Sequence, residues 1–281
     1  MENKSIKNNV LIYVLILIIL IFTNAQETFA SKDEMVDKRV YLTDLSHINV
    51  TKGSTSNLKY LNEMIKTKRP KAIYIEQWVL DEPGNKKLAK KLQQIANKNN
   101  IKFYLVVGRN SWFGRRGIVN TVEFLNRYEK YIDGVVLRTE PNKVNVWKDD
   151  VGIQAQILNQ MLDSYSAIYS ETKKRDKLFL AEFPFWYSDY QGPQKTFSQN
   201  VCDYSDKVIF LIDDLKKLDS LNIKWNDIPC PYNINITKRA TNQPEEITHE
   251  ILKTIKSKLT FYSNFNGYII DSDSTLLDTG S

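Results

Sequence analysis

The sequence predicts an α/β fold, a single (β/α)8 TIM barrel, and three observations support this prediction. Short apolar or alternating runs of strand length alternate with longer segments of helical period. Eight such strands with helical crossovers favour a parallel sheet covered by helices. At this chain length, closing the sheet into a barrel is the economical arrangement. An open doubly wound sheet is the alternative, but no glycine-rich phosphate loop follows the first expected strand.

The expected strands are short and mostly apolar. They span residues 39–45, 71–77, 101–107, 134–140, 177–183, 207–213, 228–234 and 267–271. The seventh has the weakest pattern because it contains Pro229 and Pro231. Amphipathic segments between the strands predict helices over residues 56–66, 85–97, 119–131, 151–173 and 245–262.

The amino-terminal segment predicts export. Lys4 and Lys7 precede an unbroken apolar run of thirteen residues, 10–22. This length suits the core of a signal peptide and is short for a membrane span, which needs about 20 apolar residues. Small-residue cleavage patterns end at Ala25 and Ala30. An uncleaved amino-terminal anchor is the alternative.

Residues 1–30 are therefore expected to be a signal peptide or anchor, and residues 31–281 the (β/α)8 barrel. No glycine-, serine- or proline-rich linker interrupts residues 38–273, which favours one domain. We expect the protein to be secreted or held in the cell envelope or periplasm. Cys202 and Cys230 either pair there or remain free thiols, and the sequence leaves both possibilities open.

Composition excludes some classes of function. The chain has only two histidines and no cluster of cysteine and histidine, so no metal site or other cofactor is expected. A net charge of +6 suits contact with anionic polymers, but no nucleic-acid-binding motif is present. Phosphodiester cleavage would need a histidine pair, and His249 falls in an expected helix rather than at a strand end like His47.

Carboxylates gather where the active site of a barrel lies, at the carboxyl ends of the strands. Six of the eight expected strands end in one, namely Asp44, Glu76, Glu140, Glu182, Asp213 and Asp271. Aspartates at such positions often cap the following helix, which is the simpler interpretation of Asp44 and Asp213. Glu140 and Glu182 are each followed closely by proline, and glutamate is a poor cap, so these two are the stronger functional candidates.

Tryptophans follow the same strands. Trp78, Trp112, Trp147 and Trp186 come after the second to fifth strands, and Tyr187 follows Trp186. A sugar ring packs its C–H face on an aromatic ring while its hydroxyls bind acids, amides and arginine. The alternative is that these rings pack beneath their own loops. The expected sugar-binding set is Glu76, Trp78, Trp112, Arg138, Trp147, Trp186, Tyr187, Asn233 and Asp271.

Glycoside hydrolysis requires two carboxyl groups, about 5–5.5 Å apart for a retaining enzyme and about 6.5–9.5 Å apart for an inverting one. Glu140 is the expected proton donor, and Glu182, or failing it Asp213, is the expected partner. Arg138 would hold a neighbouring carboxylate ionised.

The segments DGVVLRTEPNKVNVW (133–147) and LFLAEFPFWYSDY (178–190) resemble a group of bacterial secreted proteins with glycoside-hydrolase-like TIM barrels. The resemblance implies that Glu140 and Glu182 are the acids of strands four and five. Two features depart from the pattern. Arg138 stands where the group has an aspartate, and strand seven carries Asn233 and Asn235 instead of a nucleophilic glutamate.

Two functions therefore remain open. The first is a secreted glycoside hydrolase that acts on an extracellular or cell-surface polysaccharide by carboxylate acid/base catalysis. The second is a catalytically inactive barrel that binds carbohydrate. The expected partner in both is a polysaccharide or oligosaccharide, and membrane contact is expected only if the amino-terminal segment is uncleaved.

Overall fold

The structure is a computed structural model, and it describes residues 39–42, 62, 65–66, 70–77, 80, 86–147, 150–188, 190–192, 194–212, 225–236 and 263–271. The chain divides into two units, residues 1–37 and 38–281, and all the described residues belong to the second. The expected signal segment lies outside the described residues. In the described part of the chain, no helix combines the length and apolarity that crossing a membrane requires.

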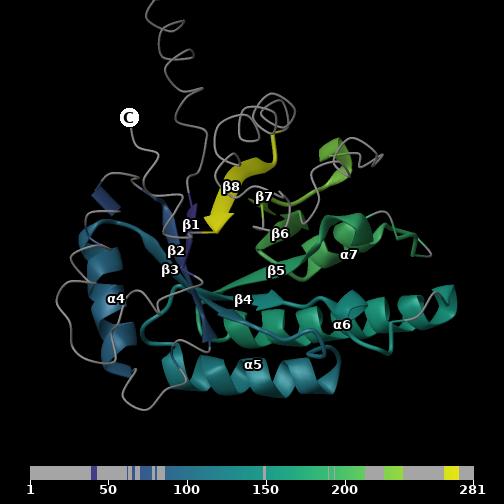
Figure 1. The fold of residues 1–281 in the computed structure, drawn as a ribbon, viewed down its shortest axis with the longest axis horizontal. Helices are drawn as coiled ribbons and strands as arrows, with labels where there is room; N and C mark the ends of the chain where they lie inside the picture. Colours follow the sequence, from purple (N-terminus) through teal and green to yellow (C-terminus); the bar gives the residue numbers. More distant parts are fainter. Residues whose placement is uncertain are drawn as a thin grey trace, which may run out of the picture. The chain divides into compact units, whose positions relative to one another are not determined.

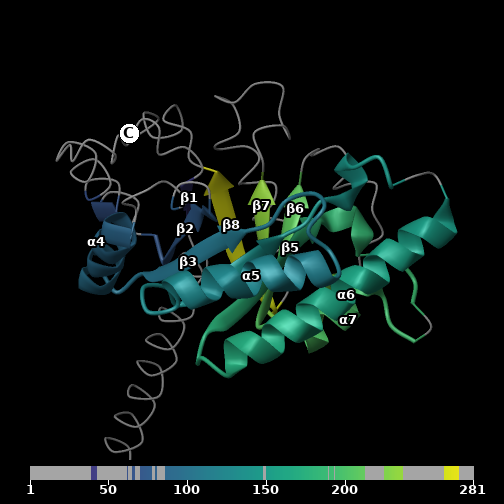
Figure 2. The ribbon, with the colours of Figure 1, turned by 90° about the horizontal axis from the view of Figure 1, so that it is seen from below.

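Eight described strands form a closed parallel barrel in chain order (Figures 1 and 2). They are β1 (Arg39–Leu42), β2 (Ala72–Glu76), β3 (Lys102–Val107), β4 (Gly134–Arg138), β5 (Leu178–Pro184), β6 (Lys207–Ile212), β7 (Tyr232–Ile236) and β8 (Phe265–Asp271). Strand β8 pairs with β1 and closes the ring. The predicted α/β barrel is confirmed.

Four described helices lie outside the barrel, namely α4 (Lys86–Lys98), α5 (Arg115–Tyr128), α6 (Val151–Lys173) and α7 (Phe197–Asp203). Figure 2 shows α5 and α6 side by side against the strands. Asp150 begins α6 because its carboxylate accepts hydrogen bonds from the backbone N–H groups of Gly152 and Ile153. The helix expected over residues 245–262, and most of the one expected over 56–66, lie outside the described residues.

The two faces of the sheet bury different side chains, as strand alternation requires. The outward face packs against the helices in the larger apolar core. The barrel interior is filled by Ala72, Tyr74, Tyr104, Val106, Val136, Leu180, Ile209 and Ile269. Within it the rings of Tyr74 and Tyr104 stack with centroids 5.2 Å apart. This interior is packed, so a ligand has to be sought at its ends.

Two aspartates secure the amino-terminal ends of strands by the same arrangement. Asp133, just before β4, accepts a hydrogen bond of 2.9 Å from the backbone N–H of Phe103 in β3. Asp206, just before β6, accepts one of 2.8 Å from the N–H of Phe179 in β5. Each carboxylate also accepts from a lysine ammonium group. The aspartate that opens the β4 segment is therefore a part of the sheet and not of a site.

Replacing Asp206 with alanine should lower the free energy of unfolding by about 1–3 kcal/mol, because it leaves a buried N–H group without an acceptor. Phe179, which carries that group, is 0% exposed. Urea unfolding measures the change. Lys173→Ala is the control, since that side chain is 40% exposed and an exposed ion pair contributes about 1 kcal/mol or less. Equal losses in the two variants would show that the ion pair, and not the backbone hydrogen bond, is the stabilising contact.

Candidate functional site

A charged network lies at the carboxyl-terminal end of the barrel interior. The last residue of β2 is Glu76, and the last residue of β4 is Arg138. Near the end of β5 lies Glu182. Each lies two positions after an interior residue, respectively Tyr74, Val136 and Leu180. Strand alternation therefore points all three side chains to the inside of the barrel mouth.

Arg138 connects the two carboxylates of this network. Its Nε donates to Glu182 Oε2 over 3.0 Å, and its Nη2 donates to Glu182 Oε1 over 3.3 Å. Its Nη1 donates to Glu76 Oε1 over 2.7 Å. The side chains of Arg138, Glu76 and Glu182 are 24%, 14% and 0% exposed. The guanidinium group thus links β2 to β5.

A glycine allows β3 to pass beside this arginine. Gly108 has φ +135°, and a Cβ atom on it would lie 1.9 Å from the carbonyl oxygen of Arg138. Its N–H donates to the side-chain oxygen of the buried Gln77 over 3.2 Å. Only a residue without a side chain fits at this position.

Asn235 completes the set of donors around Glu182. Its Nδ2 donates to Glu182 Oε1 over 2.7 Å, reaching across the interior from β7. Both oxygens of Glu182 are therefore acceptors of hydrogen bonds, from Arg138 and from Asn235. The Glu182 side chain is also 0% exposed, so these donors and the surrounding protein enclose the carboxylate.

Glu140 lies outside this network. It precedes a short 3-10 helix, Pro141–Lys143, and its carboxylate forms an ion pair with Lys143. Its side chain is 15% exposed. In the described part of the chain, no hydrogen bond or ion pair joins Glu140 to Glu182 or to Arg138. The two expected acids thus have different partners, Lys143 for Glu140 and Arg138 with Asn235 for Glu182.

Aromatic and amide groups join the loops that follow β4 and β5. Trp147 stacks on Tyr187 with ring centroids 5.2 Å apart, and Trp186 meets the edges of both rings at 5.9 and 4.3 Å. The hydroxyl of Tyr187 donates to Asn142 Oδ1 and accepts from the Asn142 backbone N–H. Tyr187 is buried, whereas Trp147 and Trp186 are partly exposed. We call Trp147, Trp186, Tyr187 and Asn142 the aromatic wall.

Trp112 lies elsewhere than expected. It is 6% exposed and belongs to the apolar core between sheet and helices, with its ring 6.3 Å from that of Phe124. The loop after β3 turns it outward under α5, so its ring is covered by protein and cannot receive a sugar.

The remaining expected residues divide into two groups. Asn233 is fully buried on the same side of β7 as Asn235. Asp271 ends β8 beside Tyr41, and only its backbone placement is described. Trp78 and Asp213 lie outside the described residues, as do Asp44, His47 and His249. Among the described residues, no three histidine, cysteine, aspartate or glutamate side chains are placed to hold a metal ion.

A buried tyrosine of α6 lies near the network on the helix side of the sheet. Tyr165 is 0% exposed, and its hydroxyl has no hydrogen-bond partner in the described part of the chain. Burial raises its pKa well above the usual value, and Tyr187 and Glu182 raise it further. Tyr165 therefore stays neutral, as a core residue should.

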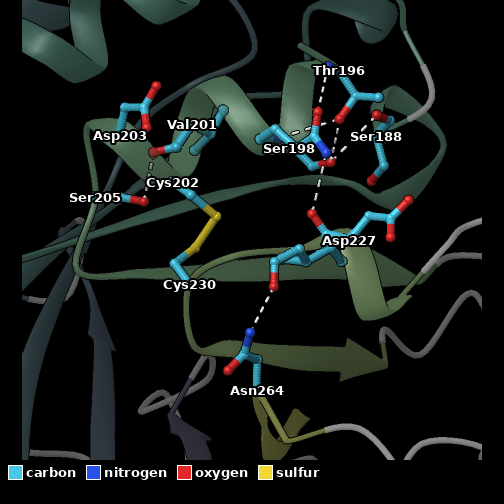
Figure 3. The surroundings of a disulfide bond; sticks show 12 residues. Ser188, Thr196, Ser198, Val201, Cys202, Asp203, Ser205, Asp227, Cys230 and Asn264 are labelled. Carbon is cyan, nitrogen blue, oxygen red and sulfur yellow. Dashed lines mark hydrogen bonds between the residues drawn. A yellow bond between two sulfur atoms is a disulfide. The ribbon is translucent and has the colours of Figure 1, made fainter.

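A disulfide bond fixes the segment that leads into β7. Cys202, in α7, is bonded to Cys230, just before β7, and their Cα atoms are 5.4 Å apart (Figure 3). Asn264 Nδ2 also donates to the carbonyl of Ile228 over 2.7 Å. Of the two possibilities that the sequence left open, the structure has the paired form. These contacts hold the amino-terminal end of the strand that carries Asn235.

Reasoning from the sequence missed Asn235 as the partner of Glu182 and Gly108 as the residue that admits Arg138. A signal for the first was present in Tyr232–Ile236, where asparagines alternate with isoleucines. A central strand that turns amides towards an apolar interior needs polar partners there, and Glu182 is an acid expected to point the same way. No local signal predicts the role of Gly108, because that role depends on how closely β3 and β4 approach each other.

No protein-family model matches the chain, and a search of curated proteins gives no match. Solved structures with the TIM-barrel fold do match. A candidate fructose-1,6-biphosphate aldolase from Coccidioides immitis is 12% identical, with 87% of this chain and 76% of that chain covered and a TM-score of 0.52. Deoxyribose phosphate aldolase from Aeropyrum pernix is 10% identical, with 88% and 91% covered and a TM-score of 0.49. The carboxyl-terminal domain of a candidate chitinase from Desulfitobacterium hafniense DCB-2 is 12% identical, with 71% and 66% covered and a TM-score of 0.47. At these identities the likeness shows the fold alone.

Proposed function

We propose that the barrel mouth binds an extracellular oligosaccharide or polysaccharide without cleaving it. The proposal rests on the burial and the hydrogen bonds of the Glu182 carboxylate. Its carboxylate is 0% exposed and accepts hydrogen bonds from Arg138 and Asn235. The acid pair of a glycoside hydrolase needs two carboxyl groups that reach the glycosidic bond, and we assign the enclosed Glu182 a structural role instead.

The groups that remain accessible suit binding of a sugar. Glu76 and Arg138 are partly exposed and offer a carboxylate and a guanidinium group for hydroxyls. Trp147 and Trp186 are partly exposed at the same end of the barrel and offer aromatic faces for C–H groups. Rigid aromatic rings beside a few fixed polar groups are the usual make-up of a sugar site.

The disulfide supports the extracellular part of the proposal. Disulfides persist in exported proteins and are rare in reducing compartments, and Cys202 and Cys230 are bonded here. The sequence of residues 1–30 adds the pattern of a signal peptide, with an uncleaved anchor as the alternative.

A glycoside hydrolase is the second candidate, and one observation favours it. The carboxyl group of Glu140 stays partly exposed at the end of β4, where the resemblance of sequence places a catalytic acid. Its partner would then be a carboxylate other than that of Glu182.

The test uses oxidised protein, residues 31–281, with oligosaccharides prepared from the producing organism's surface polysaccharide. Isothermal titration measures binding, and release of reducing ends measures cleavage. We expect binding without release, and about 10-fold weaker binding by Trp147→Ala, because that change removes a stacking face. Trp225→Ala is the matched control, since Trp225 lies before β7, at the opposite end of the barrel from the aromatic wall.

The alternative outcomes are distinct. Release of reducing ends that Glu140→Gln abolishes would replace the binding proposal with the hydrolase. Absence of both binding and release would overturn both candidates. If Trp147→Ala and Trp225→Ala weaken sugar binding equally, the aromatic wall is not part of the binding site.

A further inference from the structure

A pocket opens at the amino-terminal ends of β2 and β3, the end of the barrel opposite the mouth. Its volume is about 540 Å³, which lies within the usual range of ligand pockets. Its lining comes from the segment before β2 and from the turn between α4 and β3, namely Ile65, Lys66, Pro70, Lys71, Asn99, Asn100 and Ile101. None of these residues belongs to the charged network or to the aromatic wall, so the pocket is a separate feature of the fold.

The lining of this pocket is apolar where it is buried and polar where it is exposed. The buried part consists of Ile65, Pro70 and Ile101, and the exposed rim of Lys66, Lys71, Asn99 and Asn100. A lysine ammonium group carries three N–H donors and no acceptor. In the described part of the chain, neither Lys66 nor Lys71 forms an ion pair. Both ammonium groups are therefore open to an anionic ligand.

The carboxyl end of α4 adjoins the pocket, and carbonyl oxygens at such an end carry partial negative charge. Two of them are already occupied. The carbonyl of Ile95 accepts from Asn99 Nδ2 over 2.8 Å, and that of Ala96 accepts from the N–H of Ile101 over 2.9 Å. Asn100 turns the chain out of the helix with φ 54°, a conformation that asparagine tolerates. The repulsion that this helix end would exert on an anion is thereby reduced.

A row of lysines on α4 leads to the pocket. Lys87, Lys91 and Lys98 follow each other at intervals of four and seven residues, so they share one face of the helix, and all three are exposed. We call them the lysine stripe. Lysines four residues apart repel each other, and α4 contains no acidic residue to relieve this, whereas Arg127 of α5 pairs with Glu123 of its own helix. Lys98 directly precedes the turn that lines the pocket.

A phosphate group suits the rim, because its oxygens accept from several donors at once and lysine is a common phosphate ligand. The apolar part suits the C–H groups of a polyol or sugar. None of the lining residues is aromatic, so a nucleic-acid base would have no ring on which to stack. We propose that the pocket binds one phosphate-bearing polyol or sugar unit of an anionic polymer, and that the lysine stripe binds the phosphates that follow. This site is distinct from the proposed sugar site at the mouth and does not depend on it.

Isothermal titration of oxidised residues 31–281 with glycerol 3-phosphate tests the pocket, and glycerol is the uncharged control ligand. We expect binding of the phosphate and none of glycerol. Lys66→Gln and Lys71→Gln should each weaken this binding about 5-fold, the effect of losing one exposed ion pair. Arg116→Gln is the matched control, because it removes the same charge from an exposed side chain in the first turn of α5, at the other end of the barrel. It should change binding less than about 2-fold, since distant exposed charges are screened by salt.

A hexamer of glycerol phosphate tests the lysine stripe. It should bind about 30-fold more tightly than glycerol 3-phosphate, because linked contacts raise the effective concentration. Lys87 lies about 18 Å along the helix axis from Asn99, within reach of such a hexamer. The double variant Lys87→Gln with Lys91→Gln should weaken binding of the hexamer about 10-fold and leave that of glycerol 3-phosphate unchanged. A glutamate hexamer should bind at least about 10-fold more weakly than the phosphate hexamer, because a carboxylate has fewer oxygens to accept hydrogen bonds.

The outcomes that contradict the inference are specific. Absence of glycerol 3-phosphate binding, or equal weakening by Lys66→Gln and Arg116→Gln, would overturn the pocket as a phosphate site. If the glutamate hexamer binds as tightly as the phosphate hexamer, or if the double lysine variant keeps full affinity for the hexamer, the assignment of a phosphate polymer is wrong. Sugar binding at the mouth should be the same in Lys66→Gln as in the wild type, so failure of this site is distinguishable from failure of the proposed function.

Discussion

Arg138→Leu is expected to lower the free energy of unfolding by about 3–5 kcal/mol, the usual cost of breaking a buried ion pair by removing one partner. Glu182 is 0% exposed and would lose the cation that donates to both of its oxygens. Among the described contacts, the hydrogen bond from Asn235 Nδ2 to Glu182 Oε1 would remain. Urea unfolding at neutral pH, followed by circular dichroism, measures the change.

The double variant Arg138→Leu with Glu182→Leu is the control for this prediction. It removes both charges, and replacing a buried pair by apolar side chains is often neutral or stabilising. We expect it to recover at least half of the loss. A single Arg138→Leu variant within about 1 kcal/mol of the wild type would show that Glu182 finds another partner, and the network would lose its structural role.

Replacing both cysteines with serine is expected to lower the free energy of unfolding by about 3–4 kcal/mol. Cys202 and Cys230 are 28 residues apart, and cross-linking a loop of that length removes about this much conformational entropy from the unfolded chain, on the entropic account. Thermal unfolding of the oxidised protein, the reduced protein and the double serine variant measures it.

The reduced wild-type protein should match the double serine variant, because both lack the bond. A double serine variant as stable as the oxidised protein would mean that the packing of α7 against the barrel already holds the segment before β7. A single Cys202→Ser variant is a poor substitute, since it leaves a reactive thiol at Cys230.

Most of the fold could be predicted because each strand carries its own pattern. Val135 to Leu137 and Phe179 to Phe183 are buried runs of strand length, and helices of period 3.6 separate them. Alternation along β5 also predicts that Glu182 shares a face with Leu180, and that face is the inner one. These are local properties of the chain, and closure of the barrel follows from the number of strands.

The site was harder to predict because its contacts lie between strands that are far apart in the sequence. Glu182 has the position of a catalytic acid, but its burial depends on Arg138 and Asn235, which lie 44 and 53 residues away. Trp112 follows a strand in the same way as Trp147, yet the first turns into the helix layer and the second into the aromatic wall. Sequence alone gives the residue types at the mouth and not the direction of each loop.

The glycine beside Arg138 has a consequence for how this barrel can change over evolutionary time. Because any Cβ atom at Gly108 would collide with the backbone of β4, that point on the inner rim is closed to substitution. The segments after β4 and β5, where Asn142, Trp147 and Trp186 each contact Tyr187, are not restricted in this way. Gly108 would therefore be retained for as long as β3 and β4 keep this spacing, while those loops are free to change.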